Sequence, residues 1–206
     1  SYPNLSDVRL EDNDATSGRG GGLFIMNSIS NDRNSDDEAI LENVRIIGNK
    51  VSTDNRNPAK GGGIYTHNTS FNFQNVILEG NAALGSDSRG GGIYAYADIS
   101  EDGRAYSSDG VYGSSNSNSN YSDEGGAFFF ENQNILIDNV EITGNLSQNE
   151  AGGIFARNSN IRVINCTISN NMNNVDGAGG IYLEQSSSLK LVNSILWGNV
   201  NAQGYV

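Results

Sequence analysis

The chain has 206 residues, with 26 glycines, two prolines, one cysteine and a formal net charge of −12 at pH 7. This excess of negative charge argues against nucleic acid and against anionic membranes as partners, because like charges repel. No run of about 18 apolar residues is present, so we expect no membrane insertion by this segment.

Two short motifs recur along the chain. A seven-residue element begins with Asn or Asp and ends with Asn, with starts at Asp7, Asn43, Asn75, Asn139, Asn165 and Asn193. A glycine-led segment follows most copies, with starts at Gly20, Gly61, Gly90, Gly125, Ala151 and Ala178. The interval from Asn75 to Asn139 is twice the interval from Asn43 to Asn75. We therefore expect about seven repeats, one of them overwritten.

Each repeat contains three segments in which apolar and polar residues alternate, as they do in half-buried strands. The first lies just upstream of the seven-residue element, with Phe71 and Phe73 as an example. The second is the element itself, in which Val44 and Ile46 should face inward. The third is the glycine-led segment. We expect the first Asn of each element to form a corner with a ladder of stacked amides, and the closing Gly-Asn to form a sharp bend.

Three short strands per repeat, without helical periodicity, predict an all-β fold, a parallel β-helix of about seven coils. Coils of this kind stack at about 4.8 Å. We expect residues 1–206 to form a single domain that is a segment of a longer chain. Residues 98–124 are rich in Ser, Asn and Gly, and we interpret them as an inserted polar loop.

The motifs GGAF at Gly125 and LEGN at Leu78 are similar to the GGAI and FxxN repeats of chlamydial polymorphic membrane proteins. They look equally like the right-handed β-helix repeats of large secreted bacterial surface proteins, in which endings such as SILWGN at Ser194 are common. The resemblance implies a right-handed parallel β-helix, an extracellular or cell-surface location, and adhesion.

One outer column of the glycine-led strands is aromatic and is the candidate ligand-binding site. Its members are Phe24, Tyr65, Tyr94, Phe129, Phe155 and Tyr182. A stripe of flat rings beside a floor of glycines can stack on sugar rings. Two other interpretations stay open: the rings stack on one another beneath the loops, or the two faces are inverted and the rings fill the core.

The loop residue just before the glycines is charged in five copies: Arg19, Lys60, Arg89, Glu124 and Glu150. This column could steer an acidic partner, and a solvated rim is the alternative.

Catalytic chemistry has little support in the sequence. The carboxylates at Asp12, Asp14 and 36–38 lie in loops without a repeated cluster, so they allow either a calcium site or solvated charge. His67 is the only histidine, and we expect it on an outward strand position without a partner. Cys166 occupies an inward position and should be a small core residue. We expect no cofactor, unless these carboxylates bind Ca²⁺.

Three functions remain open. We favour a non-catalytic structural or adhesive segment of a secreted or cell-surface bacterial protein. A carbohydrate-binding module that uses the aromatic stripe is the alternative, and a fragment of a polysaccharide lyase or hydrolase is the third. The expected partners are neighbouring coils of a longer chain, further copies stacked end to end in a filament, or a glycan or cell-surface receptor.

Overall fold

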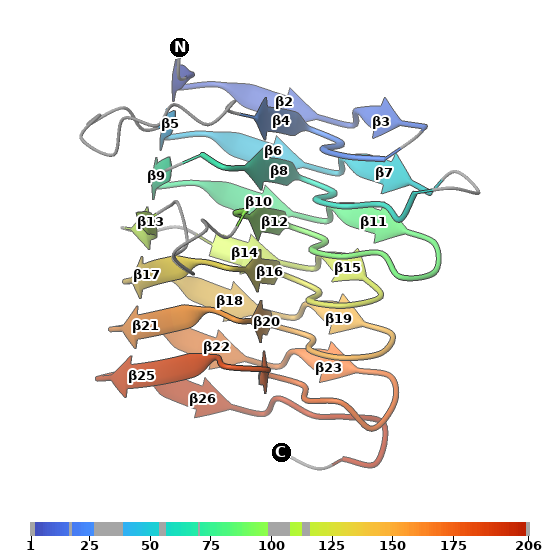
Figure 1. Ribbon diagram of the computed structural model, residues 1–206, viewed down its shortest axis with the longest axis vertical. Coiled ribbons are helices and arrows are strands. Elements are labelled where there is room, and N and C mark those ends of the chain that lie inside the picture. Colours follow the sequence, from blue (N-terminus) through green and yellow to red (C-terminus); the bar gives the residue numbers. More distant parts are fainter. Residues whose placement is uncertain are drawn as a thin grey trace.

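The computed structural model describes residues 3–16, 18–26, 39–53, 57–69, 71–98, 108–112 and 116–204. Within these ranges the regular structure consists of short strands, which pair in parallel. They form four sheets that run along the long axis of the molecule (Figure 1), with seven strands in sheets A and B and six in sheets C and D. None of the described residues forms a helix that is long and apolar enough to cross a membrane.

Sheet A contains β1 (Asn4–Ser6), β5 (Ala39–Glu42), β9 (Phe71–Gln74), β13 (Ser108–Tyr112), β17 (Asn134–Asp138), β21 (Asn160–Ile164) and β25 (Ser188–Val192). Sheet B contains β2 (Arg9–Glu11), β6 (Arg45–Ile47), β10 (Ile77–Glu79), β14 (Asn116–Asn118), β18 (Glu141–Thr143), β22 (Thr167–Ser169) and β26 (Ile195–Trp197). Sheet C contains β3 (Asp14–Ala15), β7 (Lys50–Ser52), β11 (Ala82–Leu84), β15 (Tyr121–Ser122), β19 (Leu146–Ser147) and β23 (Met172–Asn173). Sheet D contains β4 (Leu23–Met26), β8 (Ile64–His67), β12 (Ile93–Tyr96), β16 (Phe128–Glu131), β20 (Ile154–Arg157) and β24 (Ile181–Glu184).

The chain passes through sheets A, B, C and D in turn and then begins the next coil. Successive coils stack in register: Ile93 pairs with Ile64 of the preceding coil and with Phe128 of the following one. The predicted parallel β-helix of about seven coils is therefore confirmed. The number of strands per coil is corrected from three to four, because the sheet C strands contain only two or three residues, too few to show alternation.

The core lies inside the coils, where alternate residues of sheets A, B and D meet. Phe73 on β9, Leu78 on β10 and Ile64 on β8 are all buried, as the alternation predicts. The core opens at the C-terminal end of the stack, where the inward residues Leu183 on β24 and Leu196 on β26 are exposed. A hollow at this end is lined by apolar side chains that include Ile181, Leu189 and Leu196.

Residues 108–112 and 116–122 correct the interpretation of 98–124 as an inserted loop. They form β13, β14 and β15 and complete a fourth coil, in which Ser117 takes the inward position between Leu78 and Ile142. Polar residues suit this coil because their side chains are hydrogen-bonded: the Ser117 hydroxyl accepts from Asn120 Nδ2 at 3.0 Å, and the buried Ser122 hydroxyl donates to the carbonyl of Glu124 at 2.7 Å. The rest of the predicted loop, 99–107 and 113–115, lies outside the described residues.

A ladder of asparagines, buried in every coil but the first, closes the turn between sheets B and C. Its members are Asn13, Asn49, Asn81, Asn120, Asn145, Asn171 and Asn199. Each asparagine but the last donates from its backbone N–H and from Nδ2 to Oδ1 of the next. From Asn49 to Asn81 these two distances are 3.1 and 3.0 Å. The predicted corner ladder is also present at Asn43, Asn75, Asn165 and Asn193, but it is exposed. The position of the buried ladder was thus predicted only as a bend.

The three glycines at the start of strand β8 in sheet D are each required for a different reason. Gly61 has a positive φ of 67°, which disfavours other residues. A Cβ on Gly62 would lie 2.5 Å from the backbone of Ala82, and a Cβ on Gly63 would lie 3.2 Å from the ladder amide of Asn81. The glycines therefore let the D strands approach the B–C turn closely.

Candidate functional site

The outer face of sheet D carries the six aromatic residues of the predicted column in one register. Adjacent rings are stacked, with centroids between 4.5 Å for Phe129 and Phe155 and 5.5 Å for Tyr65 and Tyr94. They form a cluster separate from the central core. The four central rings are at most 2% exposed, whereas Phe24 is 46% exposed. The column is thus outward, as predicted, but its central rings stack on one another under a cover instead of forming an open platform.

The cover consists of cationic side chains that lie over the rings. Arg19 lies 5.2 Å from the Tyr65 centroid, Lys60 lies 4.8 Å from Tyr94, and Arg89 lies 5.2 Å from Phe129. Arg157 lies over both Phe129 and Phe155. Contacts of this kind are favourable because a cation is attracted to the negative face of a ring. The charged loop column is therefore more than a solvated rim, since its cations shield the aromatic column.

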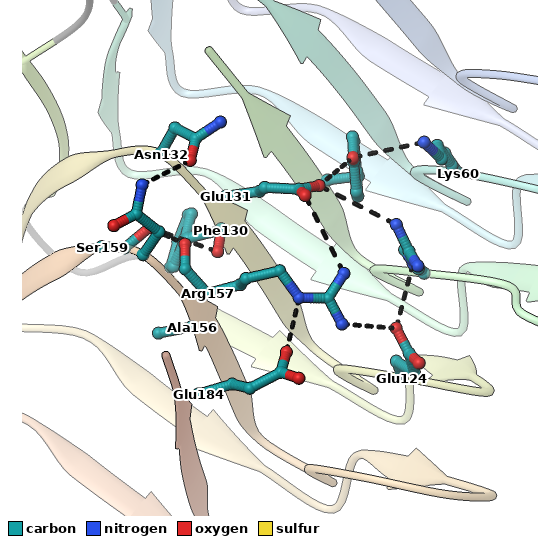
Figure 2. A network of polar contacts seen from close by, with 12 residues as sticks. Lys60, Glu124, Phe130, Glu131, Asn132, Ala156, Arg157, Ser159 and Glu184 are labelled. Carbon is teal, nitrogen blue, oxygen red and sulfur yellow. Dashed lines mark hydrogen bonds and ion pairs between the residues drawn. The ribbon is translucent and has the colours of Figure 1, made fainter. Parts of the chain in front are cut away.

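Carboxylates and Tyr94 connect three of these cations into a charged network of Lys60, Arg89, Tyr94, Glu124, Glu131, Arg157 and Glu184 (Figure 2). Figure 2 shows Arg157 among three glutamates; its guanidinium nitrogens lie 3.8 Å from Glu131 and 3.9 Å from Glu124, and Nε donates to Glu184. Arg89 Nε donates to Glu124 at 3.0 Å. Each glutamate of the network thus has a cation within ion-pair distance.

The tyrosine in the network joins its two sides. Tyr94 OH donates to Glu131 at 2.7 Å and accepts from Lys60 Nζ at 3.3 Å. Burial, reinforced by Glu131, raises the pKa of Tyr94 far above its usual range, so its hydroxyl keeps its proton. Burial also raises the pKa of Glu124, against the opposite effect of Arg89 and Arg157. The network is therefore partly desolvated and held together by mutual pairing.

A second polar cluster lies on the same face, around the only histidine in the sequence. His67 Nε2 lies 3.2 Å from Asp98 Oδ2, and the His67 ring stacks on Tyr96 at 4.9 Å. Asn68 Nδ2 also donates to Asp98, at 2.6 Å. Burial, together with the hydrogen bond to Asp98, raises the pKa of Tyr96 to about 12. The expectation that His67 has no partner is therefore wrong, because the return of the chain one coil later places Asp98 beside it.

The other predicted chemical groups are not brought together. Among the described residues, no group of three or more His, Cys, Asp and Glu side chains could hold a metal ion. The carboxylates at 36–38 lie outside the described residues. Cys166 is buried in the core, its Sγ contacts the carbonyl of Ile164 at 3.0 Å, and burial raises the pKa of its thiol. Calcium binding stays a prediction.

Sequence reasoning missed Glu131, Arg157 and Glu184 as members of one cluster. They occupy the fourth position of consecutive D strands, two residues after each aromatic. The signal was present, because residues two apart on a strand share a face. The cluster was missed because the residue type at this position changes from coil to coil: Met26, His67, Tyr96, Glu131, Arg157 and Glu184.

The stacked parallel sheets with an inner asparagine ladder define the class of β-helix solenoids. The family model described as right handed beta helix region matches residues 104–206, and the chain belongs to this family. No curated protein sequence matches the chain. One solved structure that is similar in fold is that of a candidate glycosyl hydrolase from Parabacteroides merdae. It is 14% identical, the match covers 89% of this chain and 79% of that one, and the TM-score is 0.36.

Proposed function

We propose that this chain is a non-catalytic structural and adhesive segment of a secreted or cell-surface bacterial protein. One observation carries the proposal: the charged groups on the sheet D face pair with one another over a buried aromatic column. Catalytic carboxylates must be available to a substrate, whereas Glu124 and Glu131 are each held by Arg89 and Arg157. The network therefore ties consecutive coils together, which suits a rigid rod.

The partners of such a rod follow from its exposed apolar surface. Leu196 on the last strand of sheet B and Leu183 on the last strand of sheet D follow the core residues Ile168 and Ala156 in register, but they are 42% and 39% exposed. We propose that this end contacts further β-helix coils, of the same longer chain or of another copy. Adhesion would add a glycan or a cell-surface receptor on the sides of the rod.

The test compares Glu124→Gln and Glu131→Gln with the wild-type chain in two assays. If the network is structural, the wild type releases no reducing or unsaturated sugars from a panel of neutral and acidic polysaccharides, and both variants melt at lower temperature. Release of sugars by the wild type, abolished in a variant that melts normally, would contradict the proposal and identify a polysaccharide lyase or hydrolase.

A carbohydrate-binding module is the second candidate, because the aromatic column is accessible at its ends. Phe24 is 46% exposed and Tyr182 is half-buried. Aromatic rings of this kind can stack on sugars. Binding on a glycan array that is lost in Phe24→Ala, while Met26→Ala binds normally, would favour this candidate. Tyr94→Ala is a poor test, because that ring is buried and its loss would disturb the fold.

A further inference from the structure

The charged loop column on the sheet D face changes sign at its middle. Arg19, Lys60, Arg89 and Glu124 lie side by side in four consecutive coils, each bridged in parallel to the next. Glu150 follows in the fifth coil, where it precedes the glycine-led strand as the others do. The column therefore runs from three cations in the first three coils to two carboxylates in the next two.

Within this column Arg89 and Glu124 pair with each other. The other three members, Arg19, Lys60 and Glu150, have no ion-pair partner among the described residues, and the last two are also partly desolvated. The Lys60 ammonium lies over the ring of Tyr94 and donates to its hydroxyl, and burial together with Arg89 lowers the pKa of Lys60. Glu150 has no cation within ion-pair distance, and burial together with Glu184 raises its pKa. Each is thus a partly desolvated charge that an opposite charge from outside would stabilise.

We propose that two copies of this chain pair side by side and antiparallel through the sheet D face. The two-fold axis passes between β12 and β16, the strands of the third and fourth coils. This rotation exchanges the second coil with the fifth, so that Lys60 meets Glu150 of the second copy. It also exchanges the third coil with the fourth, which brings Arg89 opposite Glu124 of the second copy.

The order of the charges selects a second copy over other partners. A polyanion would meet the carboxylates of the column, and a polycation would meet its cations. An isologous interface is self-complementary, and a column that is positive in one half and negative in the other meets this condition. The net charge of −12 repels two copies at long range. At physiological salt this repulsion is screened beyond about 8 Å, whereas charges in direct contact still attract.

A zero-length cross-link tests the pairing without any substitution. Carbodiimide joins an amine to a carboxylate only where the two are in contact. Within one chain, Lys60 and Glu150 lie three coils apart, roughly 14 Å at the usual strand spacing. We therefore expect mass spectrometry of the carbodiimide-treated chain to find a peptide that links Lys60 to Glu150 in the dimer band but not in the monomer band.

A charge exchange tests the same contact by sedimentation equilibrium. Lys60→Glu and Glu150→Lys should each weaken the dimer about ten-fold or more, because each places like charges opposite one another. The double variant restores opposite charges and should return to within about three-fold of the wild type. Lys190→Glu and Glu141→Lys are matched controls, since both residues are exposed on other sheets and carry the same changes of charge. Circular dichroism checks that each variant is folded. If Lys60→Glu does not fold, the effect of Glu150→Lys on the dimer tests the contact by itself.

Three results would overturn the proposal. The first is a chain that stays monomeric at every concentration, including one that binds a polyanion such as heparin through Lys60. The second is a dimer that the two substitutions and their combination leave unchanged, as expected for association through the last coil. The third is a dimer band without the Lys60–Glu150 link.

Discussion

At the scale of single residues, the buried asparagines connect one coil to the next. Asn145 is fully buried, and its Oδ1 accepts from the backbone N–H and the side chain of Asn120. Its own Nδ2 donates to the carbonyl of Ser117 and to Asn171 Oδ1. One side chain therefore satisfies backbone groups that would otherwise be buried without partners.

Asn145→Ala should lower the free energy of unfolding by roughly 2 to 5 kcal/mol, because it leaves the N–H of Asn120 and the carbonyl of Ser117 unpaired. Asn160→Ala is the matched control, since Asn160 also bonds the neighbouring coils but is exposed. It should cost under about 1 kcal/mol. Urea denaturation of both variants gives the comparison, and equal costs would show that the buried ladder does not stabilise the stack.

The cluster around His67 predicts a pH effect. Burial alone would raise the pKa of Asp98, but hydrogen bonds from Asn68 and Tyr96 and the nearby His67 lower it below its ordinary value of 3.8. A group whose pKa falls on folding stabilises the protein above its unfolded pKa, and this contribution is lost as the pH drops through the folded pKa. Asp98→Asn should therefore lower the melting temperature at pH 7, and the difference from wild type should shrink below about pH 4. A difference that is constant from pH 7 to pH 3 would exclude this origin.

At the scale of elements, the strands whose length allowed alternation were predicted and the shorter ones were not. The inward residues of sheets A, B and D, such as Phe73 and Ile142, follow directly from period-two patterning. Sheet C has strands of two or three residues, and its existence depends on the ladder and the glycine contacts beside it. The fourth coil was hidden because Ser and Asn occupy positions where other coils have Leu, Ile and Gly.

The fourth coil leads to a prediction about deletions. Deletion of residues 90–124 removes one complete repeat and joins Arg89 to Gly125, so that every sheet can pair again in register. We expect this shorter chain to keep its β-sheet circular dichroism spectrum, with a rod shorter by about 4.8 Å.

Replacement of 98–124 by a short Gly/Ser linker should instead unfold or strongly destabilise the chain. It removes β13, β14 and β15 but keeps β12 and β16, and a short linker cannot pass around a whole coil between them. Melting curves of both variants, followed by circular dichroism, distinguish the two outcomes. A linker variant as stable as wild type would restore the interpretation of 98–124 as a dispensable loop.

At the scale of the whole molecule, each coil contacts only its neighbours, so stability varies along the rod. The central coils are buried on both sides, while β25 and β26 expose Leu191, Ile195 and Trp197. Trp197 is the only tryptophan and reports on the last coil alone. In guanidinium, we expect the change in its fluorescence to precede the loss of β-sheet signal, and amides of β26 to exchange faster than those of β16. Coincident transitions would show that the rod unfolds as one unit.

The sequence alone determined the repeat, the parallel β-helix, the number of coils and the inward faces, because these follow from short-range periodicity repeated along the chain. It also placed the six aromatic residues in one outward column. Only the tertiary structure decided that the central rings are covered, that Arg157 lies among Glu124, Glu131 and Glu184, and that His67 meets Asp98. These contacts join residues of different coils, about 25 to 35 positions apart in the chain, and stacking brings such residues within about 5 Å of each other. Their pairing depends on which long side chains meet across that spacing, and no local pattern encodes it.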